Sequence, residues 1–74
     1  NMTFVVGSTY YDAIGRRWTI IHAAKIKDEW VFLVKEDKWI TKNYRFAIQD
    51  DPYHATVLLD DGFTTIYSDD EMTT

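Results

Sequence analysis

The chain has 74 residues, of which 46% are hydrophobic, 16% are aromatic and none is cysteine, and its formal net charge is -4. This length permits one domain with one core, and the lack of cysteine excludes a disulfide framework, a thiolate nucleophile and a cysteine-ligated zinc site. No apolar run approaches the roughly 18 residues of a transmembrane helix, and the residues after Met2 lack the pattern of a signal peptide. We therefore expect a cytoplasmic protein that does not contact a membrane and binds neither a metal nor a cofactor.

Short runs of aromatic and β-branched residues, separated by charged pairs, predict strands along most of the chain. The expected strands are residues 3–6, 17–24, 30–35, 38–41, 44–48, 54–59 and 63–67. Residues 7–13 between the first two runs are compatible with a single helical turn that begins at Ser8. Turn signals recur about every 8–12 residues, which is typical of a small antiparallel sandwich or barrel.

Residues 52–60 allow two interpretations. Asp61-Gly62 lies between two apolar runs and predicts a β-hairpin. Alternatively, Asp51 caps a helix that has Pro52 at its first position and Gly62 just after its end. The β-branched residues on both sides of Asp61-Gly62 favour the hairpin.

Alternation of side chains along each strand predicts which residues face the core. The predicted inner faces are Trp18, Ile20, His22 and Ala24; Trp30, Phe32 and Val34; Tyr44, Phe46 and Ile48; and Tyr53, Ala55, Val57 and Leu59. Residues 30–35 are apolar on both sides, which indicates a curved sheet. The predicted fold class is all-β over residues 2–68, with at most one short helix. It is a small antiparallel meander curled into an SH3-like or OB-like, partly open barrel, and an acidic tail of residues 69–74 is expected to fray.

Charge is divided unevenly along the chain. All eight basic residues lie between Arg16 and Arg45, and residues 46–74 contain seven acidic residues and no basic one. If 54–59 and 63–67 form a hairpin, five acidic residues meet at one end of the sheet, and Asp60-Asp61 lies at the other end. These five residues form the acidic cluster, which is Asp50, Asp51, Asp69, Asp70 and Glu71. Its carboxylates are interpreted first as solvated turn residues, then as a surface for a basic partner protein, and last as a cation site.

The basic segment 16–45 also contains aromatic residues, among them Trp39 and Tyr44. Exposed rings beside cations are how OB-like domains stack single-stranded bases, so nucleic-acid binding is the alternative function. The acidic net charge disfavours it, because phosphate affinity depends mainly on counterion release.

Nothing in the sequence carries the pattern of an enzyme. The candidate bases His22 and His54 lie far apart, and no nucleophile elbow, zinc-binding or phosphate-binding motif occurs. We expect a small non-enzymatic binding module, an accessory or inhibitor protein of the kind that phages and mobile elements encode, whose partner is another protein. Homodimerisation stays open, because a chain of this size buries only about 60% of its unfolded surface. The candidate anchors are the aromatic residues Trp39, Tyr44, Tyr53, Tyr10 and Tyr11.

Overall fold

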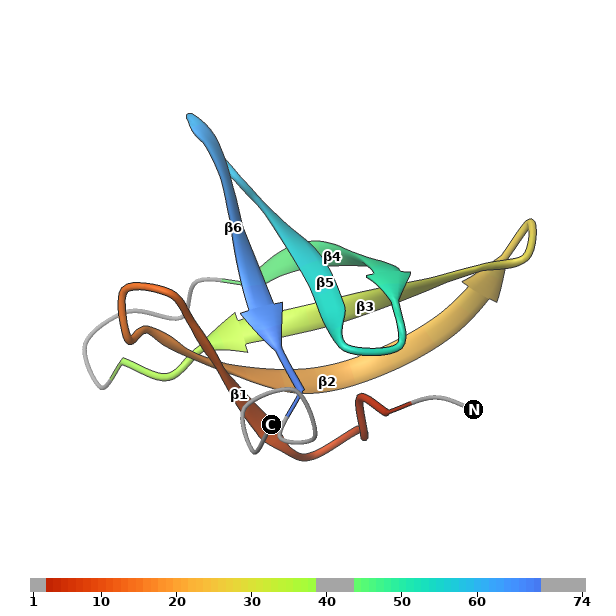
Figure 1. Ribbon diagram of the computed structural model, residues 1–74, viewed down its shortest axis with the longest axis horizontal. Helices are drawn as coiled ribbons and strands as arrows, with labels where there is room; N and C mark the ends of the chain where they lie inside the picture. The colour runs from red at the N-terminus through yellow and green to blue at the C-terminus, as the bar shows by residue number, and fades with distance from the viewer. Residues whose placement is uncertain (1–2, 39–43, 69–74) are drawn as a thin grey trace.

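The computed structural model describes residues 3–38 and 44–68 of the chain, and these form six β-strands (Figure 1). The strands are β1 (Thr9–Asp12), β2 (Arg17–Ile26), β3 (Glu29–Glu36), β4 (Tyr44–Asp51), β5 (His54–Leu59) and β6 (Gly62–Tyr67). Every neighbouring pair is antiparallel, and β1 also pairs with β6, which closes the sheet into a barrel. The predicted all-β fold class is confirmed, as a closed barrel instead of a partly open one.

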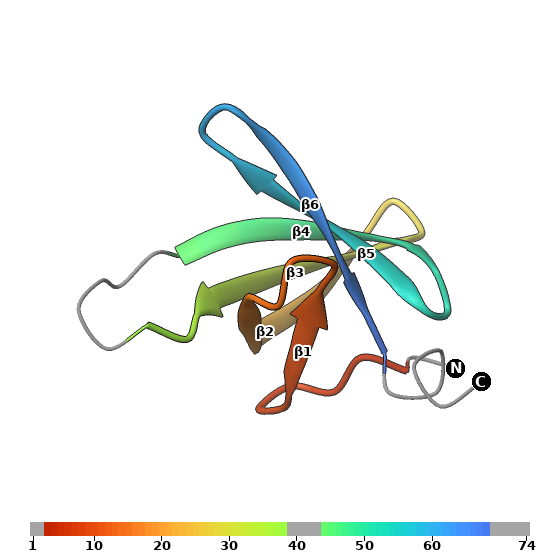
Figure 2. The same ribbon diagram turned by 60° about the vertical axis from the view of Figure 1, so that its left-hand side comes forward.

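The six strands follow one another around the barrel in chain order, so the fold is a simple meander. The β2–β3 and β5–β6 hairpins extend beyond the closed part of the sheet in different directions, as Figure 2 shows. The seam is short: β1 and β6 pair only Tyr11 with Tyr67 and Asp12 with Ile66.

The core is built from side chains on every strand together with Phe4, which precedes β1. Its buried members are Phe4, Tyr10, Trp18, Ile20, Phe32, Val34, Ala47, Ala55, Val57 and Ile66. The rings of Phe4 and Tyr10 meet edge to face with their centroids 4.9 Å apart. Trp18 and Phe32 are the large residues on the long strands, and the alanines of β4 and β5 leave room for them.

Two element predictions at the start of the chain are wrong. Residues 3–6 do not form a strand: they enter the barrel as irregular chain, and Phe4 caps the core. The helical turn predicted within residues 7–13 is instead strand β1, which follows Gly7 at a φ of 93°. The Gly7 amide donates to the Ile20 carbonyl at 2.8 Å, so this turn aligns β1 with β2. Most of the predicted strand 38–41 lies outside the described residues.

The hairpin interpretation of residues 54–67 is confirmed, and the helix alternative is wrong. Leu58 pairs with Phe63 and Leu59 with Gly62, so Asp60-Asp61 forms the turn. This segment therefore forms strands and not a helix, as the preference of its β-branched residues for a pleated sheet indicates.

The predicted faces are correct for β3 and, apart from Tyr53, for β5, and they fail on β2 and β4. Tyr53, which precedes β5, was predicted to face the core but is 41% exposed. In β2, a bulge between Ile20 and His22 shifts the alternation, so His22 is exposed and Ala23 packs against the core. In β4 the whole face is inverted: Ala47 is buried, whereas Tyr44 and Phe46 are 47% and 60% exposed. The most apolar side of β4 therefore faces outward.

Candidate functional site

An apolar strip crosses the outer face of the barrel on β4, β5 and β6. Its members are Phe46, Leu58 and Phe63, which are 60%, 45% and 69% exposed. Leu58 pairs directly with Phe63, and the neighbouring Ala47–Val57 pair places Phe46 beside Leu58. The three side chains therefore form one continuous cross-strand row, which we call the apolar strip.

The strip continues at its margins onto other apolar side chains. Phe46 pairs with Leu33 of β3, while Tyr44 and Ile48 flank it on β4. At about 200 Å² for each ring, the two phenylalanines alone expose on the order of 250 Å². With its neighbours, the strip reaches the size of the largest apolar patch on a typical monomer, and such patches mark interaction sites.

Acidic residues lie on both sides of the strip, toward the two ends of the strands that carry it. Asp60-Asp61 forms the β5–β6 turn beside Leu58 and Phe63, and Asp50 follows Ile48 on the outer face of β4. The Asp60 side chain is 89% exposed, and its carboxylate lies 3.3 Å from the Arg45 guanidinium. A basic residue, Lys35 of β3, pairs with Tyr44 at one corner of this face. The strip is therefore bordered by acidic side chains on two sides and by a lysine at one corner.

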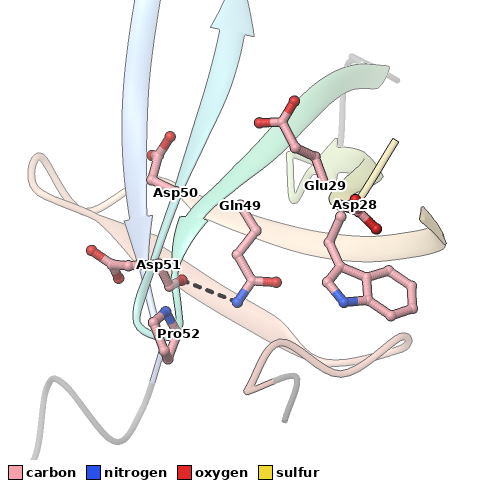
Figure 3. Close-up of a pocket in the computed structure, with 7 residues that line it drawn as sticks. Asp28, Glu29, Gln49, Asp50, Asp51 and Pro52 are labelled. Carbon is pink, nitrogen blue, oxygen red and sulfur yellow. Dashed lines mark hydrogen bonds between the residues drawn. The ribbon is translucent and has the colours of Figure 1, made fainter. Parts of the chain in front are cut away.

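A second feature is a cavity of about 520 Å³ between the β2–β3 turn and the β4–β5 turn (Figure 3). We call it the acidic pocket. It is lined by Asp28, Glu29, Trp30, Gln49, Asp50, Asp51 and Pro52. Glu29 and Trp30 precede Val31 on β3, and Gln49 and Asp50 follow its partner Ile48 on β4. The ends of β3 and β4 therefore both contribute to the wall of this pocket.

Asp50 and Asp51 are held in place by their neighbours around the β4–β5 turn. Asp51 accepts hydrogen bonds from the Tyr53 amide at 2.8 Å and contacts the His54 ring at 2.8 Å. The backbone hydrogen bond from Tyr53 and then the bond from His54 lower the pKa of Asp51. The Asp50 carboxylate accepts a hydrogen bond from the Thr56 hydroxyl. The lowered pKa keeps Asp51 ionised at neutral pH, and hydrogen bonds hold both side chains in the pocket wall.

A buried polar cluster at the opposite end of the barrel has a structural role. The Asp12 carboxylate is buried and accepts hydrogen bonds from the Arg16 guanidinium at 2.8 Å, the Trp18 indole at 3.2 Å and the Thr64 hydroxyl at 3.0 Å. It also accepts from the Arg16 backbone amide at 2.8 Å. Because Trp18 is in the core and Thr64 is on β6, Asp12 ties the barrel seam together.

The predicted anchors fall in different places. Tyr10 is 3% exposed and packs in the core, and its hydroxyl accepts a hydrogen bond from the Val5 amide at 2.7 Å, so it is not available to a partner. Tyr11, Tyr44 and Tyr53 are each between 40% and 50% exposed, on three different strands or turns. Tyr44 borders the apolar strip. Trp39 lies outside the described residues.

The predicted acidic cluster is partly described. Asp50 and Asp51 lie at one end of β5 and Asp60-Asp61 at the other, as the hairpin requires, while Asp69, Asp70 and Glu71 lie outside the described residues. Sequence reasoning missed that Asp28 and Glu29 join Asp50 and Asp51. The signal for this was available, because the β2–β3 and β4–β5 turns of a meander lie at the same end.

Sequence reasoning also missed that Phe46, Leu58 and Phe63 lie together on the surface.

Within residues 3–38 and 44–68, no group of three or more acidic or histidine residues is placed to hold one metal ion, and no helix could cross a membrane. Comparisons with protein-family models, curated proteins and solved structures found no match to this chain.

Proposed function

We propose that this protein is a small non-enzymatic binding module, and that it docks on another protein through the apolar strip. The observation that carries the proposal is the inversion of β4, which leaves Phe46 exposed in one row with Leu58 and Phe63. Burying such a row behind a partner removes apolar area from water, at about 25 cal/mol per Å² before the costs of association. Exposed aromatic anchors of this kind dominate the energetics of protein interfaces.

The chemistry around the strip supports a partner segment that is apolar and basic. Acidic residues lie on both sides of the strip, in the Asp60-Asp61 turn and at Asp50 near the other end of the strands. A second copy of this chain stacked face to face would bring acidic ends against acidic ends, which opposes self-association. The same charges repel a polyanion, so nucleic-acid binding is less favoured on this face than binding of a basic protein segment.

The test is selection of peptides from a random library displayed on phage, against the purified protein. Peptides that combine an aromatic or aliphatic residue with a basic one should be enriched. Phe46→Ser/Phe63→Ser should weaken their binding at least tenfold, because it removes both exposed rings. Substitutions of exposed side chains change stability by about 0.5 kcal/mol or less, so the variant should stay folded by circular dichroism.

The matched control is Ile14→Ser, which removes an apolar side chain that is 74% exposed in the β1–β2 turn, away from the strip. It should bind the selected peptides within twofold of the unchanged protein. Equal binding of the peptides to Phe46→Ser/Phe63→Ser would contradict the proposal. So would a single-stranded oligonucleotide that binds at low salt and loses binding in that variant.

A further inference from the structure

We infer that the partner segment pairs with β6 as an added antiparallel β-strand, with an apolar residue beside Phe63 and a basic residue beside Asp61. The inference rests on the proposed function and deepens it, because it assigns the conformation and the side-chain pattern of the segment that covers the apolar strip. The pairing site is the side of residues 63–65 that points away from β5, and we call it the β6 edge.

Most of β6 lies beyond the seam that closes the barrel. The strand covers Gly62–Tyr67, but β1 pairs with it only at Ile66 and Tyr67. Figures 1 and 2 both show the tip of the β5–β6 hairpin standing away from β1. Within the described parts of the chain, no strand pairs with the β6 edge, so it is open to one more strand.

Strand register identifies the backbone groups that the β6 edge offers. The Leu59–Gly62 pair closes a two-residue turn, so it is hydrogen-bonded, and hydrogen-bonded pairs with β5 recur at every second position. The Thr64 N–H therefore points toward β5, whereas the N–H groups of Phe63 and Thr65 point away from it. No described strand pairs with β6 at those two positions on that side. An extended partner segment supplies acceptors for both amides, as in other cases of β-strand addition.

A second open edge, on β2, carries features that oppose pairing. β1 pairs with β2 only as far as Thr19, so residues 22–26 have no described strand on that side. The β2 bulge begins this stretch, and Lys25 and Lys27 place positive charges at its end. Bulges and edge lysines are two of the features by which proteins prevent unwanted strand pairing.

The β6 edge lacks these protective features. Residues 62–67 contain no proline and no charged side chain, and their pairing with β5 shows no register shift. A flat, uncharged edge next to an exposed phenylalanine is the kind of edge that accepts another strand. Of the two open edges, β6 is therefore the one suited to a partner.

An antiparallel register specifies the side chains of the added strand. Its residue opposite Phe63 lies on the outer face and extends the apolar strip by one position, so an apolar side chain there packs on the exposed ring. Two positions later, the partner residue lies beside the exposed Asp61, where a lysine or arginine gains a favourable charge contact. The expected pattern is an aromatic or aliphatic residue, any residue, and then lysine or arginine.

A second copy of this chain fits the β6 edge poorly. The open stretch is short, because β1 occupies the same side of β6 from Ile66 onward. Two β6 edges paired antiparallel would bring the Asp60-Asp61 turn of each copy against β1 of the other. A separate extended segment avoids this collision.

The first test is amide hydrogen exchange by NMR, with and without the tightest peptide selected on phage. In the free protein the Thr64 amide should exchange more slowly than those of Phe63 and Thr65, because it bonds to β5. Saturating peptide should slow the Phe63 and Thr65 amides by a factor of about ten or more. Unchanged exchange at both amides would overturn the inference, and it would leave the proposed function standing if Phe46→Ser/Phe63→Ser still abolishes binding.

The second test is N-methylation of the same peptide, one residue at a time. Methylating the apolar residue opposite Phe63 should weaken binding about tenfold, because its N–H donates to the Phe63 carbonyl. Methylating the next residue, whose N–H points away from β6, should weaken binding less than threefold. Equal effects at the two positions would show that side chains alone hold the peptide, and the inference would be wrong.

The third test is Thr65→Pro, which removes an N–H that points away from β5. Proline is tolerated on an edge strand at such a position, so circular dichroism should show an intact fold. Peptide binding should weaken about tenfold. The matched control is Lys25→Pro, which removes an N–H on the open side of β2 and should change binding less than twofold. If Thr65→Pro does not fold, the exchange and methylation results decide.

Two further outcomes separate this inference from the proposed function. Peptides that lose binding in Phe46→Ser/Phe63→Ser but bind a folded Thr65→Pro normally would overturn the added strand alone. Peptides that still bind Phe46→Ser/Phe63→Ser, or a library that yields no peptide, would overturn both.

Discussion

At the scale of single residues, Asp12 makes the most hydrogen bonds of any side chain described. Its carboxylate joins the β1–β2 turn to Trp18 in the core and to Thr64 on β6. Arg16 neutralises its charge from 2.8 Å. A buried carboxylate with this many donors stabilises the fold only while all of its partners stay in place.

Replacing Asp12 with alanine should therefore cost about 3 kcal/mol, because the indole N–H of Trp18 loses its acceptor and the Arg16 guanidinium loses its counter-charge. Urea denaturation followed by tryptophan fluorescence measures this as a lower midpoint with an unchanged slope. The control is Asp60→Ala, which breaks an exposed pair with Arg45 and should cost less than about 1 kcal/mol. Equal costs for the two variants would contradict this role of Asp12.

Asp12 also predicts how stability depends on pH. Burial raises its pKa, but the hydrogen bonds from Trp18, Arg16 and Thr64 outweigh burial, so the pKa is lower than in the unfolded chain. Its contribution is therefore complete above the unfolded value of about 4 and is lost as the pH falls through the folded value.

Denaturation curves between pH 6 and pH 2 should show a flatter acid dependence for Asp12→Asn than for the unchanged protein. Some dependence should remain in the variant, because the pKa of Asp51 is lowered as well, by the Tyr53 amide and His54. Identical acid dependence in both proteins would show that Asp12 is not perturbed in the fold.

At the scale of elements, the β2–β3 turn is notable for its backbone. Lys27 and Asp28 form a two-residue loop with φ angles of 49° and 68°, so both residues are in the left-handed region. A loop with this geometry favours Asn-Gly, because glycine adopts positive φ without a steric penalty. Asp28 therefore occupies a position where glycine would be more stable, and it lines the acidic pocket.

Asp28→Gly should raise the stability of the protein by about 0.5–1 kcal/mol, since it relieves the strained backbone. Thermal melting measures this as a higher midpoint of unfolding. A variant that is less stable than the unchanged protein would contradict the argument from backbone strain.

The elements also show what the sequence could and could not predict. Strands 30–35 and 54–59 were predicted correctly because aromatic and β-branched residues lie there between clear turn residues. The inner face of β4 was mispredicted because Tyr44, Phe46 and Ile48 are more apolar than Arg45, Ala47 and Gln49, and hydrophobicity alone assigns them to the core. The small Ala47 is buried because Phe32 pairs with it and the core space is already filled.

The candidate site was predictable only in part. That Asp50 and Asp51 lie at one end of β5 followed from the hairpin, and the predicted meander also implied that Asp28 and Glu29 lie at the same end, although this step was not taken. The β2 bulge could not be foreseen, because no glycine or proline marks it between Ile20 and His22. On β4 the hydrophobic pattern of the sequence and the observed fold disagree about which side faces the core. The proposed docking surface lies on this strand, and such conflicts are expected at functional sites.

At the scale of the whole molecule, the barrel is closed by its weakest pairing. β2 and β3 pair along nearly their whole length, whereas β1 and β6 join at Tyr11–Tyr67 and Asp12–Ile66. Regions with few pairing contacts open at lower free energy than the strands of the core.

Native-state hydrogen exchange should therefore show faster exchange for the amides of Tyr11 and Tyr67 than for those of Phe32 and Val34. The Asp12→Asn variant should widen this difference, because its side chain no longer holds the seam with a full charge. Equal protection at the seam and on β3 would show that the barrel opens only by global unfolding.

The whole molecule presents two surfaces of different chemistry, one apolar and one acidic. The measurement that tests the central claim most directly is NMR shift mapping with the tightest peptide selected on the intact protein. We predict that the largest amide shifts fall on Phe46, Leu58, Phe63 and their strand neighbours, and that Phe46→Ser/Phe63→Ser abolishes them. Shifts confined to Arg16, Arg17 and the rest of β2 would contradict the account, because they would place the binding surface elsewhere on the barrel.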